Sequence, residues 1–281
     1  NVLESEDVLS CVNCLRKLGV KILKTKNKEY KIYGKGLGSL RINKNKTLDC
    51  GNSGTTARLL IGLLSTNPDI KVKITGDHSL KKRNMSKLIK LMAEFGATFY
   101  PLKRDRFPLT LVSSEMPVGI NYRAGVSAQL KSAVILAGLN SYGVTNIIEE
   151  KKSRNHTENM LLKNSNILQI KKNKKSHNHI KIFGKRYLDP LKMNICGDSS
   201  SAAFFAALSI LNSKSYLKIK NVGLNPRRIG FYSLLKKHGA NIKFINLKKH
   251  NNETVGDILI NKSKLKPIKA NASYYVSSTD E

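Results

Sequence analysis

The sequence predicts an α/β fold made of repeated βαβαββ modules, and three observations support this prediction. Three segments begin with small polar residues and continue into an apolar helical pattern: Gly51–Ser65, Gly125–Asn140 and Gly197–Asn212. Each is followed by a short β-branched strand and then by a second amphipathic helix. The interval is roughly 70–75 residues, longer than the ~20–50 residues of ordinary solenoid repeats. Modules of this kind must pack together to bury their helices.

The chain opens with the end of an earlier module. Leu15–Ile22 contains a helix end, then Gly19, then the start of a strand. We therefore expect the sequence to begin inside the second helix of a preceding module. At the other end, Asn271–Glu281 resembles the approach to a further module whose helix is not reached. The expected organisation is three whole modules between two incomplete ones.

Within each module the first helix leads to a strand, a basic turn and a second helix. The predicted strands are Ile70–Thr75, Val144–Glu149 and Tyr216–Val222, and the basic turn residues are Arg83, Arg154, Arg227 and Arg228. Glycine just after the last apolar turn is the expected helix C-cap, because it adopts positive φ without strain. Gly96 and Gly239 occupy this place in the first and third modules, and the Asn164–Asn166 region occupies it in the second.

The composition is strongly basic, with 50 Lys and Arg against 19 Asp and Glu and a formal net charge of +31. Such a charge ordinarily suggests nucleic acid. However, most of the surplus is lysine, and the lysine clusters lack interleaved aromatic residues on which bases could stack. We therefore expect no nucleic acid partner and favour small anionic ligands. Apolar runs such as Ala133–Leu139 are far shorter than the roughly 20 residues of a membrane span, so no membrane partner is expected either.

The cysteines and histidines do not indicate a metal or redox centre. Cys11, Cys14, Cys50 and Cys196 are too sparse for a disulfide framework. Cys11 and Cys14 fit two positions of a helix better than a zinc or redox pair, since no second pair or nearby histidine accompanies them. We expect no metal and no cofactor. No signal peptide is visible, and the first residue is not Met, so the expected location is cytoplasmic, or plastid if a transit peptide is missing.

The loops before the first helices are the best candidates for a ligand site. They are Asn52–Thr56, Ser127–Gln129 and Asp198–Ser201. Free N–H groups and the positive end of the helix dipole attract anions at such positions. Ordinary N-capping by Asn, Ser, Thr and Asp is the alternative for any single loop. Because arginines follow in the chain and bind phosphate or carboxylate through two N–H groups, the repeated pattern favours a shared anion site.

Six collinear motifs spread over the whole chain carry a family resemblance. They are Leu48–Leu59, Gly76–Arg83, Ser127–Leu139, Ser153–Glu158, Gly197–Phe205 and Asn221–Pro226. Together they resemble the 5-enolpyruvylshikimate-3-phosphate (EPSP) synthases, most closely the bacterial type whose second motif reads Gly-Asp-x-Ser-Leu. The resemblance implies transfer of the enolpyruvyl group of phosphoenolpyruvate to the 5-hydroxyl of shikimate 3-phosphate, with release of phosphate. This step belongs to the shikimate pathway of aromatic amino acid biosynthesis.

The same resemblance implies a two-domain enolpyruvyl transferase fold, an inside-out α/β barrel of three modules per domain around a cleft. Residues 1–196 would form most of one domain and residues 197–281 part of the second, so the fold would be incomplete here. Closure of the domains would complete the site and exclude water. The resemblance further implies a monomer that needs no cofactor.

The family's functional residues match positions of this sequence. For shikimate 3-phosphate the matching residues are Ser127, Ala128, Gln129, Ser153 and Asp280; for phosphoenolpyruvate they are Asn52, Gly54, Thr55, Arg83 and Gln129. Asp280 matches the carboxylate proposed to remove the proton of the attacking hydroxyl. The space left by Gly54 implies sensitivity to phosphonate mimics of phosphoenolpyruvate.

Some features depart from the family pattern. Asn84 stands where a proline is usual, and Asn155 stands where an aspartate is usual, which removes a carboxylate that could orient Arg154 or His156. The early Lys-Ser loop with its arginine and the late arginine and lysine groups have no counterpart, so we expect this chain alone to be catalytically inactive.

Three alternative functions stay open. The first is the sister enolpyruvyl transferase acting on UDP-N-acetylglucosamine, although no cysteine here has the setting of that enzyme's reactive cysteine. The second is a basic nucleic-acid-binding or RNA-end-processing protein. The third is a decayed copy that binds shikimate 3-phosphate without turnover.

Overall fold

The computed structural model describes residues 2–26, 29–43, 46–163, 166–173, 176–212 and 216–281. The chain divides into two compact units. Unit 1 comprises Asn1–Lys151 and Asn164–Leu191, and unit 2 comprises Lys152–Lys163 and Lys192–Glu281. The division of the chain into domains at residue 196 stays a prediction.

Unit 1 begins with the second half of a module. Helix α1 (Glu6–Lys17) is followed by an antiparallel hairpin of β1 (Lys21–Lys24) and β2 (Tyr30–Tyr33). The first whole module then contains, in order, β3 (Thr47–Asp49), α2 (Gly54–Ser65), β4 (Lys71–Thr75), α3 (His78–Lys82), α4 (Ser86–Glu94), β5 (Thr98–Tyr100) and β6 (Leu109–Val112). Its sheet has the order β3-β4-β6-β5, with only the first pair parallel.

The second module repeats this arrangement. It contains β7 (Asn121–Ala124), α5 (Ala128–Leu139), β8 (Val144–Glu149), α6 (His156–Leu161), β9 (Leu168–Lys172) and β10 (Asn178–Phe183). The sheet order β7-β8-β10-β9 is the same as in the first module, again with one parallel pair. Helix α6 lies in unit 2, whereas the other elements of this module lie in unit 1.

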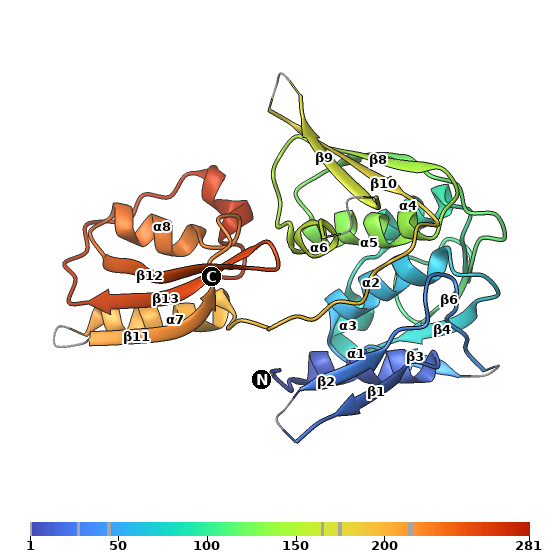
Figure 1. Cartoon of the computed structure of the whole chain (residues 1–281), viewed down its shortest axis with the longest axis horizontal. Helices are drawn as coiled ribbons and strands as arrows, with labels where there is room; N and C mark the ends of the chain where they lie inside the picture. The colour runs from blue at the N-terminus through green and yellow to red at the C-terminus, as the bar shows by residue number, and fades with distance from the viewer. Residues whose placement is uncertain (1, 27–28, 44–45, 164–165, 174–175, 213–215) are drawn as a thin grey trace. The chain divides into compact units, whose positions relative to one another are not determined.

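The third module forms most of unit 2. It contains α7 (Ser199–Leu211), β11 (Tyr216–Gly223), α8 (Gly230–Lys237), β12 (Asn241–His250) and β13 (Glu253–Asn261), followed by the 3-10 helix η1 (Ala272–Ser277). The sheet order is β11-β13-β12, and a single parallel bridge from Gly197 to Val222 takes the place of the first strand. The predicted α/β fold of repeated βαβαββ modules is therefore confirmed (Figure 1).

Three helices end in the same way because glycine follows each of them. Gly19, Gly96 and Gly239 have φ values of +84°, +93° and +95° after α1, α4 and α8. In each case the glycine N–H and the next N–H donate to carbonyls of the last helical turn, as in Ala97 N to Met92 O at 3.1 Å. The predicted glycine C-caps are confirmed. The corresponding prediction for Asn164–Asn166 falls mainly on residues 164–165, which lie outside the described residues.

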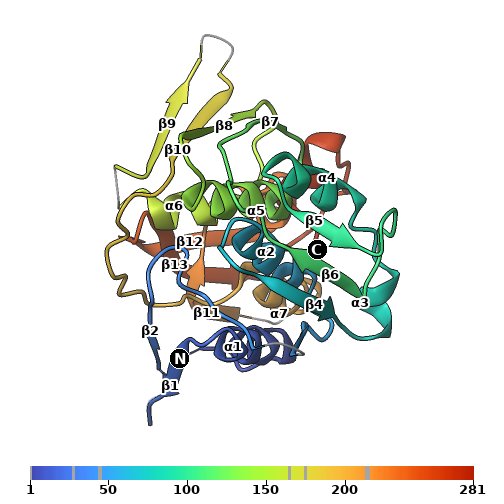
Figure 2. The same ribbon diagram turned by 90° about the vertical axis from the view of Figure 1, so that its right-hand side faces the viewer.

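Helices α2 and α5 form the interior of unit 1 and run side by side between its two four-stranded sheets (Figures 1 and 2). Their backbones approach closely at Gly62, where an added Cβ would stand 2.5 Å from the carbonyl oxygen of Ala133. In unit 2 the core forms between α7, α8 and the sheet. It includes Ala206 and Ile210 of α7, Tyr232 of α8 and Ile258 and Ile260 of β13. Helices on the inside and sheets on the outside thus position the helix N-termini of unit 1.

Cys11 and Cys14 lie in a helix, as the apolar pattern around them predicted. Cys11 and Cys14 are both in α1, and the Cys14 thiol donates to the carbonyl oxygen of Asp49 at 3.2 Å. The described residues include no group of three or more His, Cys, Asp or Glu side chains arranged to hold a metal ion. None of the helices in the described ranges has the length and apolar character needed to cross a bilayer.

Candidate active site

All three first helices begin with a side-chain cap. Ser53 Oγ accepts from Thr56 N at 3.1 Å, Ser127 Oγ accepts from Leu130 N at 3.4 Å, and Asp198 Oδ2 accepts from Ser201 N at 2.8 Å. One cap satisfies only one of the four N–H groups that a helix leaves without an intrahelical partner. N-capping and anion binding are therefore compatible at these three loops.

Two guanidinium groups flank the first residue of α2. Arg83 donates from Nη2 to Asn52 Oδ1 at 3.1 Å, and Arg58 donates from Nη1 to the carbonyl oxygen of Gly54 at 3.1 Å. An added Cβ on Gly54 would stand 2.6 Å from Nη1 of both arginines. Glycine at this position is therefore what lets both guanidinium groups reach the N-terminus of α2.

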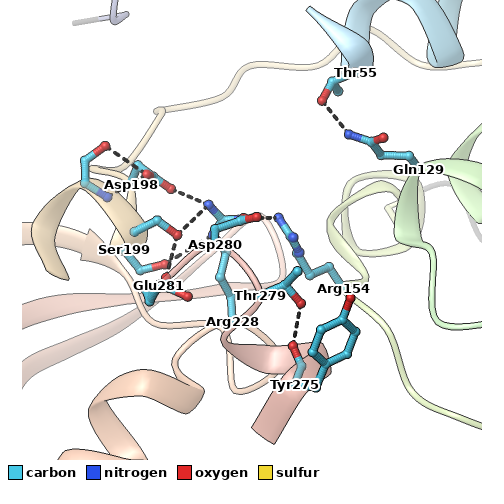
Figure 3. A network of polar contacts seen from close by, with 12 residues as sticks. Thr55, Gln129, Arg154, Asp198, Ser199, Arg228, Tyr275, Thr279, Asp280 and Glu281 are labelled. Atoms are coloured by element: carbon cyan, nitrogen blue, oxygen red, sulfur yellow. Dashed lines mark hydrogen bonds and ion pairs between the residues drawn. The ribbon is translucent and has the colours of Figure 1, made fainter. Parts of the chain in front are cut away.

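Gln129 joins this arginine pair to the N-terminus of α5. Its Oε1 accepts from Arg58 Nη1 at 2.9 Å, and its Nε2 donates to Thr55 Oγ1 at 2.8 Å. Figure 3 shows the second of these bonds, with Thr55 on α2 and Gln129 on α5. The N-termini of two equivalent helices, from two modules, therefore meet at one place in unit 1.

The electrostatics of this place favour an anion. Burial, together with repulsion by the neighbouring Arg83, lowers the pKa of Arg58 below its ordinary value. Within the part of the chain that the structure describes, neither arginine forms an ion pair with a carboxylate. Two converging cations without a neutralising carboxylate are the chemistry expected for binding phosphate or carboxylate.

A second arginine pair lies in unit 2 around Asp280. Arg154 Nη1 lies 2.9 Å from Asp280 Oδ2, and Arg228 Nη1 lies 3.5 Å from the same oxygen (Figure 3). Arg228 is itself held at the N-terminus of α7, since Nη2 contacts Asp198 Oδ1 at 2.8 Å and Ser200 Oγ at 3.0 Å. Two guanidinium groups thus fix the position of the Asp280 carboxylate.

The loop before α6 is packed against the loop before α8 in the same unit. Ser153 is fully buried, and its carbonyl oxygen accepts from Arg227 Nη1 at 2.8 Å. His156 Nδ1 lies 2.8 Å from Glu253 Oε1. Burial opposes ionisation of Glu253, but hydrogen bonds from His156, Asn159 and Asn225 outweigh it and lower the pKa of this carboxyl.

The two departures from the family pattern are accommodated locally. Asn84 Oδ1 accepts from Ser86 N at 2.8 Å at the start of α4, so the residue serves as a turn and helix-start residue. Asn155 donates from Nδ2 to Asn159 Oδ1 at 3.0 Å and accepts at Oδ1 from Asn225 Nδ2 at 3.0 Å. Glu253 orients His156, a role expected from the family pattern for an aspartate at position 155.

The site residues predicted from the sequence fall into two sets. Unit 1 contains Asn52, Gly54, Thr55, Arg83, Ser127, Ala128 and Gln129, where hydrogen bonds join Arg83 to Asn52 and Gln129 to Thr55. Unit 2 contains Ser153 and Asp280, and Arg154, the residue after Ser153, pairs with Asp280. Sequence reasoning assigned no role to Arg58, although it stands one helical turn after Gly54. That spacing was the available signal, because residues i and i+4 share a helix face. The contact of Arg228 with Asp280 was also missed.

The structure first defines a class, an α/β protein of repeated modules in which two arginines flank the N-terminus of a buried helix. The model of the EPSP synthase (3-phosphoshikimate 1-carboxyvinyltransferase) family matches residues 1–275. The chain belongs to the EPSP synthase family.

Individual relatives agree with this assignment. The chain is 37% identical over 281 residues to a 3-phosphoshikimate 1-carboxyvinyltransferase of Parvibaculum lavamentivorans, covering 100% of this chain and 62% of the relative. It is 38% identical over 281 residues to that of Zymomonas mobilis, covering 100% of this chain and 61% of the relative. It also superposes on a solved EPSP synthase from Acinetobacter baumannii with a TM-score of 0.84 and 33% identity, covering 99% of this chain and 62% of that one. The chain therefore spans somewhat less than two thirds of these relatives.

Proposed function

We propose that the protein containing this chain transfers the enolpyruvyl group of phosphoenolpyruvate to the 5-hydroxyl of shikimate 3-phosphate and releases phosphate. The observation that carries this proposal is the convergence of Arg58 and Arg83 at Gly54, with Gln129 bonded to Arg58 and to Thr55 at the same helix N-terminus. Both substrates carry a phosphate, and both carry a carboxylate, so a site for them needs several cationic and neutral donors. The names of the relatives above support the same reaction.

Phosphoenolpyruvate is assigned to the N-terminus of α2 in unit 1. Asn52, Gly54 and Thr55 supply the loop and the helix start, and Arg83 supplies a guanidinium group. Arg58 is added to this set because it reaches both Gly54 and Gln129. Positive charge from the arginines and the helix dipole would stabilise the anionic substrate and the charge that develops as phosphate departs.

Shikimate 3-phosphate is assigned to Ser127, Ala128 and Gln129 at the N-terminus of α5, and to Ser153 and Asp280 of unit 2. In the proposed addition step, Asp280 accepts the proton of the 5-hydroxyl of shikimate 3-phosphate, while the oxygen of that hydroxyl forms a bond to C2 of phosphoenolpyruvate. A general acid protonates C3. In the later elimination a base removes a proton from C3 as the bond from C2 to the phosphate oxygen breaks, which restores the double bond and releases phosphate. Paired acid and base groups are the usual requirement for such a step.

The partners proposed for this protein are the two small anionic substrates. We propose further that it acts as a cytoplasmic monomer without a nucleic acid partner. Binding of a single-stranded or duplex oligonucleotide with a steep dependence on salt would contradict the last point.

The test is phosphate release from phosphoenolpyruvate by the protein made from the complete reading frame. Release is expected only when shikimate 3-phosphate is present. Release that depends on UDP-N-acetylglucosamine instead would replace this assignment with the sister transferase. Tight binding of shikimate 3-phosphate without any release would favour a decayed enzyme.

A further inference from the structure

A buried ion pair lies in the second module behind the residues assigned to shikimate 3-phosphate. Lys131 of α5 places Nζ 2.5 Å from Oε1 of Glu149, the last residue of β8. Asn178, the first residue of β10, donates from Nδ2 to the other oxygen of Glu149 at 2.7 Å. The side chains of Lys131 and Glu149 are both 0% exposed, and the three residues all belong to unit 1.

Stability alone is a poor explanation for this pair. Removing two charges from water is costly, and replacing a buried ion pair by apolar residues of similar size is often neutral or stabilising. The protein itself offers a comparison at the same place in its other modules. Counted from the N-cap, the position of Lys131 is occupied by Ala57 in α2 and by Ala202 in α7, and both alanines are buried. The same module therefore forms without a charged residue at this position.

The position of the pair relative to the site suggests its role. Lys131 follows Gln129 by two residues, and its backbone N–H donates to the carbonyl oxygen of the N-cap Ser127 at 3.2 Å. The ion pair thus joins the first turns of α5 to the end of β8. Gln129 must hold one orientation to contact both Arg58 and Thr55.

Most of the other buried residues of α5 are small or aliphatic. The helix is surrounded on several sides by small and aliphatic contacts, including Ala133, Val134, Ile135 and Ala137, which are all 0% exposed. Apolar contacts are not directional, whereas a hydrogen-bonded ion pair is, and buried polar groups are known to fix helix register in some systems.

We propose that Lys131, Glu149 and Asn178 are positioning residues that set the rotation of α5 and so hold Gln129 in place for substrate binding. This inference rests on the function proposed above. The experiment therefore needs one readout that does not require enzyme activity.

The main variant is Lys131→Met combined with Glu149→Gln, which removes both charges together and leaves an acceptor for Asn178. A matched control is Lys24→Met combined with Glu4→Gln, which removes an exposed 2.7 Å ion pair in the same unit. The milder Asn178→Ala variant keeps the ion pair and serves if the main variant does not fold. The first readout is the NMR signal of the Gln129 side-chain amide, assigned with Gln129→Ala.

The signal of Gln129 is expected to shift in the main variant, to shift less in Asn178→Ala, and to be unchanged in the control. The second readout is kcat/KM in a double-mutant cycle with Gln129→Ala. With Gln129 present, we expect the main variant to lose about 10-fold in kcat/KM, which corresponds to one hydrogen bond to a charged group. In the Gln129→Ala background we expect the same change to cause almost no loss in kcat/KM.

An unshifted Gln129 signal in a folded main variant would overturn the inference. Fully additive effects of the main variant and Gln129→Ala on kcat/KM would also overturn it. If the signal shifts as expected but the unmodified protein releases no phosphate, the positioning role stands and the proposed function fails. If release is normal and the signal does not move, only the positioning role fails.

Discussion

Gly54→Ala is the substitution whose effect the structure defines most closely. The new Cβ would stand 2.6 Å from Nη1 of Arg58 and from Nη1 of Arg83. Optimal contacts between heavy atoms lie at about 3.5–4.0 Å, so each guanidinium group must withdraw by roughly 1 Å. Both are the ends of flexible side chains, and alanine is a better helix residue than glycine by up to ~1 kcal/mol. The free energy of unfolding should therefore change little.

The binding of phosphoenolpyruvate should change much more. Displacing one hydrogen bond from a charged group costs about 1.5–3 kcal/mol, which corresponds to an increase in KM for phosphoenolpyruvate of roughly 10- to 150-fold. The KM for shikimate 3-phosphate should rise less, because none of the residues proposed to bind it lies in α2. A phosphonate mimic of phosphoenolpyruvate should lose inhibition in parallel.

The assay is steady-state phosphate release with each substrate varied in turn, together with thermal unfolding. Gly34→Ala is the matched control, because an added Cβ there meets nothing within 4 Å. A folded Gly54→Ala protein whose KM for phosphoenolpyruvate stays within about two-fold of the unmodified value would refute the placement of phosphoenolpyruvate at α2 and the reasoning from the two arginines.

Four further predictions concern stability and catalysis. Gly62→Ala should lower the free energy of unfolding by about 1–3 kcal/mol, because the Cβ would lie 2.5 Å from a backbone oxygen of Ala133; an unchanged urea midpoint would argue against this helix contact. Asp280→Asn should lower kcat by roughly 10²- to 10⁴-fold. Arg228→Gln should lower kcat by about 10-fold, and both variants should change KM less than kcat. Full activity of Asp280→Asn would exclude Asp280 as the proposed base. The pKa of Glu253 is lowered in the folded state, so its contribution to stability is present above the ordinary carboxyl range near 4.3 and is lost as the pH falls through the lowered value. Melting temperatures measured from pH 6 to pH 2 should therefore fall less steeply in Glu253→Gln, and equal slopes would contradict this.

The repeated modules could be predicted from the sequence because their signals are local. Ser53, Ser127 and Asp198 each cap a helix, and Gly96 and Gly239 each end one. These signals depend on a few neighbouring residues, so they can be recognised without knowledge of the tertiary fold. The strand order and the single parallel pair in each four-stranded sheet could not be read in the same way.

The contacts of the site were harder to predict because they join distant parts of the chain. Gln129 meets Thr55 and Arg58 from another module, 74 and 71 residues away. Nothing in the local pattern around Arg58 indicates that meeting. Likewise, Lys131 in an apolar helix suggests an exposed residue until Glu149 and Asn178 are seen beside it. Membership of α6 in unit 2 also depends on tertiary contacts alone.

The most direct test of the account is a crystal structure of the complete protein with phosphoenolpyruvate and shikimate 3-phosphate bound. Acidic oxygens of phosphoenolpyruvate should lie within hydrogen-bond distance of Arg58 and Arg83 beside Gly54. Phosphoenolpyruvate bound at a place where neither arginine touches it would contradict the account.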